Sequence, residues 1–305
     1  MESEFIAWLG ARLPRHEQLT LGIGDDAALV RLRERGDLLI STDMLMDTVD
    51  FHLEQVDPRR IGRKAMAVNL SDIAAMAGRP LAAVVSVALP RSAGLPLAKA
   101  LCEGFLPLAE QFDLALAGGD TNSWDGPLVI SVTILGEPTE RGPLTRRGAL
   151  PGDVILVTGA FGGSILGRQF DFEPRVAEAL ALRARYELHA GIDVSDGLTL
   201  DLSRLAAASG CGAVVEPGKI PIAEAAREFA EHEPSRGTAL DHALSDGEDF
   251  ELILAAPPDA ARQMLADQPL GVPLTAIGQV VAEPGLWQVD AAGARRPLEA
   301  RGFLH

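Results

Sequence analysis

The stretch Arg141-Gly142-Pro143-Leu144-Thr145-Arg146-Arg147-Gly148, with Pro151-Gly152-Asp153 shortly after it, divides the chain into two halves. Its content of Gly, Pro and Arg is typical of a polar connection, and Pro-Gly-Asp is a turn signature. An apolar strand is predicted directly afterwards, over Val154–Thr158. The length of 305 residues also suits roughly two domains of about 150 residues each. We therefore predict an N-terminal domain of residues 1–148 and a C-terminal domain of residues 149–305.

Strands and helices are predicted to alternate on both sides of this boundary. The N-terminal half shows a helix over Glu4–Leu13, a strand over Leu38–Thr42, a helix over Pro58–Met76, a strand over Leu81–Leu89, a helix over Ala98–Gln111, and strands over Leu114–Ala117 and Leu128–Leu135. The C-terminal half adds, after its first strand, helices over Pro174–Leu188 and Leu198–Ala208, and strands over Ala213–Glu216, Phe250–Ala255 and Thr275–Val281. This order predicts the α/β or α+β class.

The chain is strongly acidic, with 27 basic against 43 acidic side chains and a formal net charge of −16. A nucleic-acid-binding protein neutralises phosphates with clustered Lys and Arg, and an anionic membrane surface attracts basic segments. The charge therefore argues against both kinds of partner. The lysines are Lys64, Lys99 and Lys219 alone, so we expect any phosphate-binding clamp to be built on Arg.

No stretch of the sequence is typical of a signal peptide or a membrane span. The first residues lack a basic region, and the longest uncharged stretches, Pro80–Pro90 and Val154–Gly167, are too short or too rich in Gly for the roughly 20 residues of a span. We expect a soluble, cytoplasmic protein. Cys102 and Cys211 are far apart, and we expect both to be buried small side chains rather than a redox pair.

Acidic residues gather at predicted strand ends and Gly turns, where side chains project into one crevice at the edge of a sheet. They are Asp25, Asp26, Asp43, Asp120, Asp193, Asp196, Asp246, Glu248 and Asp249, and Asp72 joins them from within a helical pattern. Each Asp taken alone fits ordinary turn or capping chemistry. Together they would repel one another unless cations neutralise them, and carboxylate oxygens select Mg²⁺ or Ca²⁺.

Common calcium and catalytic signatures are absent from the sequence. Asp193-Val194-Ser195-Asp196-Gly197 lacks the alternating ligands of an EF-hand, and its twelfth position is Arg204 rather than Glu. The phosphate-binding loop of P-loop enzymes, the nucleophile elbow, the zinc-protease helix and the protein-kinase catalytic loop do not occur either. Nucleotide binding would therefore use a less familiar scaffold.

Seven motifs occur together and in order, and with them the chain resembles the thiamine-monophosphate kinases, in the superfamily that includes aminoimidazole ribonucleotide synthetase. The motifs are Leu21–Asp26, Ser41–Leu45, Ala67–Met76, Gly118–Thr121, Leu144–Arg146, Ile192–Leu198 and Gly247–Asp249. The resemblance implies an N-terminal domain with a mixed sheet that pairs with a second copy in a homodimer, and a C-terminal α/β domain. It also implies transfer of the γ-phosphoryl group of ATP to thiamine monophosphate, giving thiamine diphosphate.

The resemblance assigns roles to individual residues. The implied Mg²⁺ ligands are Asp26, Ser41, Thr42, Asp43, Asp72, Asp120, Asp193 and Asp196, and the implied ATP contacts are Gly119, Asp120, Arg146 and Ser195. Several Mg²⁺ ions would bridge the phosphates during direct in-line transfer. We expect no catalytic general base, because the acceptor is an ionised phosphate oxygen.

The implied contacts to thiamine monophosphate are Asp50, Glu248 and Phe303, and two of these depart from the family pattern. Asp50 stands where the family usually has His, and His52, two residues later, is the alternative. Phe303 stands near the place of a family aromatic residue and is equally well explained as core packing. A third departure is Asp246, where the family commonly has Gly.

The alternatives to this interpretation are other enzymes of the superfamily and a non-catalytic protein that only binds cations. A selenide-activating relative would carry a reactive Cys near its start, whereas the first Cys is Cys102, and a hydrogenase-maturation relative would end in a modified Cys, whereas this chain ends in His305. A purine-synthesis relative is opposed by the motif set as a whole. A non-catalytic cation-binding protein would show no dependence on nucleotide.

Overall fold

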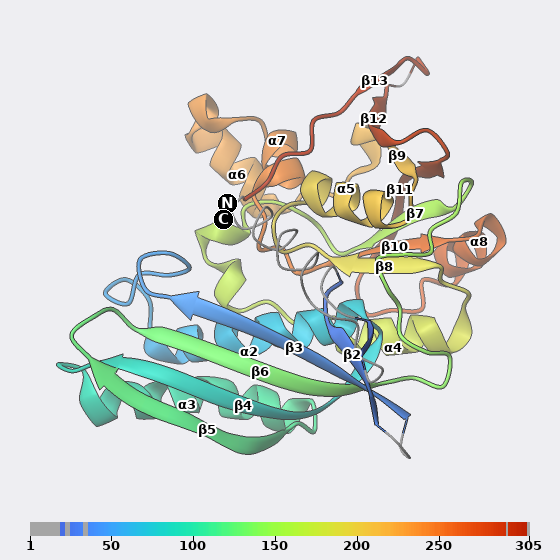
Figure 1. Ribbon diagram of the computed structural model, residues 1–305. Helices are drawn as coiled ribbons and strands as arrows, with labels where there is room; N and C mark the ends of the chain where they lie inside the picture. The colour runs from blue at the N-terminus through green and yellow to red at the C-terminus, as the bar shows by residue number, and fades with distance from the viewer. Residues whose placement is uncertain (1–18, 22–24, 33–35, 291, 304–305) are drawn as a thin grey trace.

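The two halves of the chain form two mixed sheets, each with its own helices, in the computed structural model, which describes residues 19–21, 25–32, 36–290 and 292–303 (Figure 1). The first sheet has the order β1-β2-β3-β6-β4-β5, with β4 and β5 parallel and the other pairs antiparallel. Its strands are β1 (Leu19–Leu21), β2 (Ala28–Leu32), β3 (Gly36–Met46), β4 (Gly78–Pro90), β5 (Ala115–Trp124) and β6 (Val129–Pro138). Helices α2 (Pro58–Ala75) and α3 (Gly94–Gln111) cover one face.

The second sheet has the order β13-β12-β9-β11-β7-β10-β8, in which β9 and β12 are parallel. Its strands are β7 (Val154–Thr158), β8 (Ala190–Asp193), β9 (Gly212–Val215), β10 (Leu252–Ala256), β11 (Leu274–Val281), β12 (Gly285–Val289) and β13 (Arg295–Pro297). The helices are α4 (Val176–Arg185), α5 (Leu198–Ala208), α6 (Glu224–His232), α7 (Ala239–Ser245) and α8 (Pro258–Asp267), with short 3₁₀ turns η1 (Ser164–Leu166), η2 (Arg168–Phe170), η3 (Pro217–Lys219) and η4 (Pro234–Arg236). The predicted two-sheet α/β class is confirmed.

Helix α2 lies between the two sheets and positions residues of both halves. It starts where Pro58 was predicted to start a helix, and the side chain of its N-cap, Asp57, accepts a hydrogen bond from the Arg59 backbone N–H at 2.9 Å. One side packs on β3, β4 and β6, and the other contacts α4, β8 and η2. A Cβ on Gly62 would lie 2.2 Å from the Leu101 carbonyl oxygen, so this glycine allows the close packing of α2 on α3.

Some expectations need correction or lie outside the described residues. Cys211 is buried as predicted, but Cys102 is exposed, at an open pocket that α3 forms with strands β4 and β5. The predicted helix over Glu4–Leu13 and residues 22–24 of the first motif lie outside the described part of the chain. Among the described residues, no helix has the length and apolar character needed to cross a membrane.

Candidate active site

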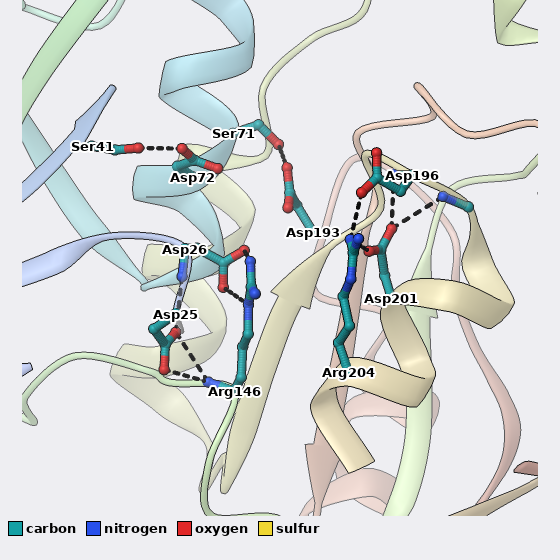
Figure 2. Close-up of polar contacts among 11 residues, drawn as sticks. Asp25, Asp26, Ser41, Ser71, Asp72, Arg146, Asp193, Asp196, Asp201 and Arg204 are labelled. Carbon is teal, nitrogen blue, oxygen red and sulfur yellow. Dashed lines mark hydrogen bonds and ion pairs between the residues drawn. The ribbon is translucent and has the colours of Figure 1, made fainter. Parts of the chain in front are cut away.

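Three carboxylates from three separate elements meet where the two halves of the chain are in contact. Asp26 lies in the turn before β2, Asp72 lies near the end of α2, and Asp193 is the last residue of β8. One carboxylate oxygen from each lies within 4.8 Å of those of the other two (Figure 2). The sequence predicted all three as metal ligands, and the fold brings them together from both halves of the chain.

Burial and mutual repulsion disfavour the charged forms of Asp72, Asp193 and their neighbour Asp43. Burial, together with the charges of Asp43 and Asp193, raises the pKa of Asp72 well above its usual range. Burial, together with the charge of Asp26, does the same to the pKa of Asp193. Burial also raises the pKa of the half-buried Asp43, on β3, to about 6. A cation beside these acids would therefore favour their ionised forms.

Two serine hydroxyls orient the acids of this group. Ser41 Oγ donates a hydrogen bond to Asp72 Oδ2, and Ser71 Oγ donates to Asp193 Oδ2 (Figure 2). Ser41 was predicted as a neutral metal ligand, and the structure places its hydroxyl against one of the predicted carboxylates. Ser71 is part of the third motif but was given no role. Both hydroxyls fix the side chains that they bind.

Arg146 compensates one of the three carboxylates. Its Nε and Nη2 donate to the two oxygens of Asp26 at 3.0 and 2.9 Å, in the bidentate geometry that Arg also forms with phosphate. Its backbone N–H donates to both Asp25 oxygens at 3.2 Å. Burial and the neighbouring Asp26 raise the pKa of Asp25 to about 6. The predicted nucleotide-binding Arg is therefore already seated among the carboxylates.

A second acidic turn lies beside this group, around Asp196. Arg204 Nη1 donates to Asp196 and to Asp201, and Asp201 Oδ2 also accepts from the backbone N–H groups of Asp196 and Gly197 at 2.9 and 3.1 Å (Figure 2). Burial and the charge of Asp196 raise the pKa of Asp201 to about 7. Asp201 was not predicted as a site residue from the sequence. The available signal was an acid in the first turn of a helix that starts after Gly.

Thr42 is a predicted metal ligand that the structure places elsewhere. Successive side chains of a strand point to opposite faces, so Thr42 faces away from its neighbours Ser41 and Asp43. Its exposed Oγ1 lies 3.0 Å from Thr133 Oγ1 and donates to the Val132 carbonyl oxygen at 3.0 Å. The Thr42 hydroxyl is therefore separated from the carboxylate group by the sheet.

Gly119 and Asp120, two predicted nucleotide contacts, lie on the exposed edge strand β5. Strand β5 is three positions from β3 in the sheet, and three spacings of about 4.8 Å make about 14 Å. Asp120 is in register with Ser86, another exposed residue, and its carboxylate accepts a hydrogen bond from the Thr121 N–H at 3.0 Å. Within one chain, the fold does not bring these two residues to the carboxylate group.

Two of the predicted acceptor-side residues, Asp50 and Glu248, contact Lys64, which was not predicted as functional from the sequence. Lys64 Nζ donates to both oxygens of Glu248 at 2.8 and 2.7 Å and to the Asp50 carbonyl oxygen at 3.0 Å. Burial raises the pKa of Glu248, and Lys64 opposes that shift. Of the two alternatives before α2, Asp50 is half-buried at this contact and His52 is exposed.

Ser195 and Phe303 both lie next to Asp196. The Ser195 carbonyl oxygen accepts the Glu248 N–H at 2.7 Å, and the Phe303 N–H donates to the Asp196 carbonyl oxygen at 2.9 Å. The Phe303 side chain is 51% exposed, which excludes the core-packing interpretation. The end of the described chain therefore reaches the edge of the site with an accessible aromatic ring.

The arrangement as a whole is suited to polyphosphate chemistry. More carboxylates than basic groups face one another, and carboxylate oxygens are the ligands that hard divalent cations prefer. Arg146 supplies a guanidinium for phosphate oxygens. Residues of both halves contribute, so ligands bound here would contact both domains.

Comparisons with known proteins agree with these features. Family models of the AIR synthase related protein match residues 24–137 with the N-terminal domain and residues 162–287 with the C-terminal domain. The thiamine-monophosphate kinase of Rhodopirellula baltica is 45% identical over 316 residues, covering 100% of this chain and 97% of the relative.

Solved structures of this family share the fold. The crystal structure of thiamine-monophosphate kinase from Stenotrophomonas maltophilia K279a has a TM-score of 0.74 and 35% identity, covering 93% of this chain and 94% of that one. The structure of AaThiL complexed with AMPPCP and TMP has a TM-score of 0.79 and 25% identity, covering 99% and 94%. The chain belongs to the AIR synthase-related family and, within it, to the thiamine-monophosphate kinases.

Proposed function

We propose that the reaction of this family, the ATP-dependent phosphorylation of thiamine monophosphate to thiamine diphosphate, takes place at the carboxylate group of Asp26, Asp72 and Asp193. The observation that carries this proposal is the convergence of three acids from both halves of the chain on one point, with Arg146 as the neighbouring guanidinium. A relative of the same fold has been solved with AMPPCP and TMP, which supports binding of both substrates.

The residues present fit Mg²⁺. Asp26, Asp72 and Asp193 offer oxygen ligands close enough to share an ion, and Asp43, Asp196 and Ser41 lie around them. Buried acids with raised pKa values gain from a cation beside them, because it favours their ionised forms. When bound, Mg²⁺ would neutralise phosphate charge during transfer. Thr42 and Asp120 stay predicted ligands, although their side chains lie away from this group in one chain.

The residues of the chain bind and orient the two substrates. Arg146 would exchange its bidentate contact with Asp26 for phosphate oxygens of ATP, with Ser195 and Gly119 as further nucleotide contacts. Asp50, Glu248 and Phe303 would hold thiamine monophosphate. No proton has to be removed from the acceptor, because its phosphate oxygen is ionised, so in-line transfer depends on positioning and charge stabilisation.

We also propose a homodimer formed through the first sheet. Its edge strand β5 is exposed over most of its length, and an unpaired edge is a surface on which another chain can add. A second copy placed there would give Gly119 and Asp120 a neighbouring surface that one chain lacks. We also propose that the enzyme is cytoplasmic.

The test is direct measurement of product. The protein incubated with ATP, thiamine monophosphate and Mg²⁺ is expected to form thiamine diphosphate and ADP in equal amounts, measured by liquid chromatography. Unphosphorylated thiamine is the matched control acceptor, and chelation of Mg²⁺ with EDTA is expected to stop turnover. Absence of thiamine diphosphate at saturating substrates would contradict the proposal.

A further inference from the structure

Lys64 is a fully buried lysine in the middle of α2, with 0% side-chain exposure. Its ammonium group lies within hydrogen-bond distance of four oxygens: the Asp50 carbonyl, Gln169 Oε1 and both oxygens of Glu248. An ammonium group has three N–H donors, so these acceptors use all of them. Lys64 therefore has no donor left for a phosphate and acts on the residues that it binds.

The partners of Lys64 come from three segments that meet at the acceptor side. Asp50 lies in the turn that follows β3, Gln169 lies in η2, and Glu248 belongs to the Gly247–Asp249 motif. The first segment is in the N-terminal half and the other two are in the C-terminal half. One side chain thus fixes two predicted substrate-binding residues, Asp50 and Glu248, relative to each other across the two domains.

Glu248 is held from two sides but keeps an accessible edge. Its φ of 54° lies in the left-handed region, and its N–H is bound to the Ser195 carbonyl oxygen at 2.7 Å. Its side chain is 27% exposed, whereas its partner Lys64 is fully covered. Each carboxylate oxygen can accept more than one hydrogen bond, so Glu248 can bind Lys64 and a cationic or donor group of a ligand together.

The docking of α2 on the C-terminal half does not depend on Lys64 alone. Arg60 on the same helix pairs with Asp171, and Arg63 pairs with Glu173 at 3.4 Å. These contacts would remain after loss of the Lys64 ammonium. A variant at Lys64 would therefore mainly release Glu248 and the Asp50 turn.

We infer that Lys64 is a positioning residue for the phosphate acceptor, which sets the orientation of Glu248 and the Asp50 turn around thiamine monophosphate. This inference rests on the proposed function, because it assumes that the acceptor is bound between these two residues. It assigns no contact between Lys64 and either substrate. The nucleotide side, built on Arg146 and Asp26, is independent of it.

The test compares Lys64→Met with Arg60→Met, a control one turn away that also loses a contact between the domains but touches neither Asp50 nor Glu248. Lys64→Met is expected to raise the KM for thiamine monophosphate about tenfold or more and to leave the KM for ATP within about twofold. Arg60→Met is expected to leave both within about twofold. Lys64→Gln, which keeps a donor for the Asp50 carbonyl, replaces Lys64→Met if that variant does not fold.

A double variant separates positioning from general damage. Because Lys64 acts through Glu248, Lys64→Met in a Glu248→Gln background is expected to raise the KM for thiamine monophosphate by a smaller factor than it does in the wild type. Equal changes in both KM values, a fall in kcat alone, or fully multiplicative effects would overturn the inference while the wild type still forms thiamine diphosphate. A wild type that forms none would overturn the proposed function and this inference with it.

Discussion

The adjacent strands β8 and β10 border two groups of buried carboxylates that are neutralised in different ways. Asp193 ends β8 and is in register with Leu252 of β10, and Asp249 and Glu251 come directly before Leu252. Asp193 meets Asp26 and Asp72 near α2, whereas Asp249 and Glu251 are buried in the C-terminal domain. Asp193, Asp249 and Glu251 therefore lie at the same end of one pair of strands.

The group in the C-terminal domain, which we call the balanced group, has one guanidinium for each carboxylate. Arg175 donates to both oxygens of Glu251 at 2.7 and 2.6 Å, and Thr158 Oγ1 donates to the same carboxylate at 2.7 Å. Asp249 accepts from Arg168 at 2.8 Å and from Ser164 Oγ at 2.7 Å. Contacts within the C-terminal domain therefore compensate the charge of both acids.

The group between the domains, which we call the unbalanced group, has more acids than basic side chains. Asp26, Asp43, Asp72 and Asp193 share Arg146, whose guanidinium is bound to Asp26. The difference shows that burial or number of acids does not identify a metal site by itself. The acids between the domains differ in that the described residues supply too few basic groups to balance their charge.

Asp72→Asn is expected to give the largest effect, a fall in kcat of about 100-fold or more, because one carboxylate that balances the bound cations is lost. In EDTA the same variant is expected to have a higher melting temperature than the wild type at neutral pH, since a buried, repelling acid becomes neutral. Activity assays and thermal unfolding would measure the two changes.

Asp249→Asn is the matched control in the balanced group. It is expected to lower the melting temperature in EDTA, because Arg168 loses its buried partner, and to change kcat far less than Asp72→Asn does. If Asp72→Asn kept near-wild-type kcat, or destabilised the metal-free protein as Asp249→Asn does, the contrast between the two groups would be wrong.

Glu251→Gln tests the balanced group by its stability. Removing one partner of a buried ion pair leaves the other charge uncompensated, so we expect a loss of about 3 kcal/mol in the free energy of unfolding. Urea denaturation followed by circular dichroism would measure it, with the exposed pair residue Asp259→Asn as a control expected to change stability by less than about 0.5 kcal/mol. A loss no larger than the control would show that Arg175 finds other partners.

The sequence predicted the members of the unbalanced group better than their contacts. Asp26, Asp72 and Asp193 belong to recognisable local motifs, and Gly turns and strand ends bring such side chains to one edge. Lys64 and Asp201 were missed because their roles arise from tertiary contacts with Glu248 and Asp196. A lysine within an amphipathic helix carries no local sign that it will be buried.

Thr42 and Asp120 show a different limit. Each belongs to its motif, but strand alternation and sheet order place their side chains away from the carboxylate group in one chain. Strand β8 was not predicted for another reason, because its four residues are too few to show a clear periodicity. Helix α7 did carry a usable local signal, a capping box formed by Thr238 and Asp241.

The smallest expected effect is a pH dependence of the free energy of unfolding. Mg²⁺ should remove this dependence for the acids between the domains and leave it in place for Asp249. Burial raises the pKa of Asp43 to about 6 from an ordinary value of 3.8, so its contribution to stability is complete below pH 3.8 and is lost as the pH rises through 6. For Asp43 alone, this predicts a loss of about 1 kcal/mol between pH 5 and 7.5 in EDTA.

Burial also raises the pKa of Asp249 to about 6, so its contribution to the free energy of unfolding should be lost in the same pH range. Saturating Mg²⁺ would bind the ionised acids between the domains and should abolish the pH dependence that they contribute to the free energy of unfolding. The pH dependence contributed by Asp249 should remain, because Arg168 and Ser164 occupy that carboxylate. Urea denaturation at both pH values, with Mg²⁺ and with EDTA, measures the difference, and identical pH dependence in the two solutions would contradict the assignment of the unbalanced group as the cation site.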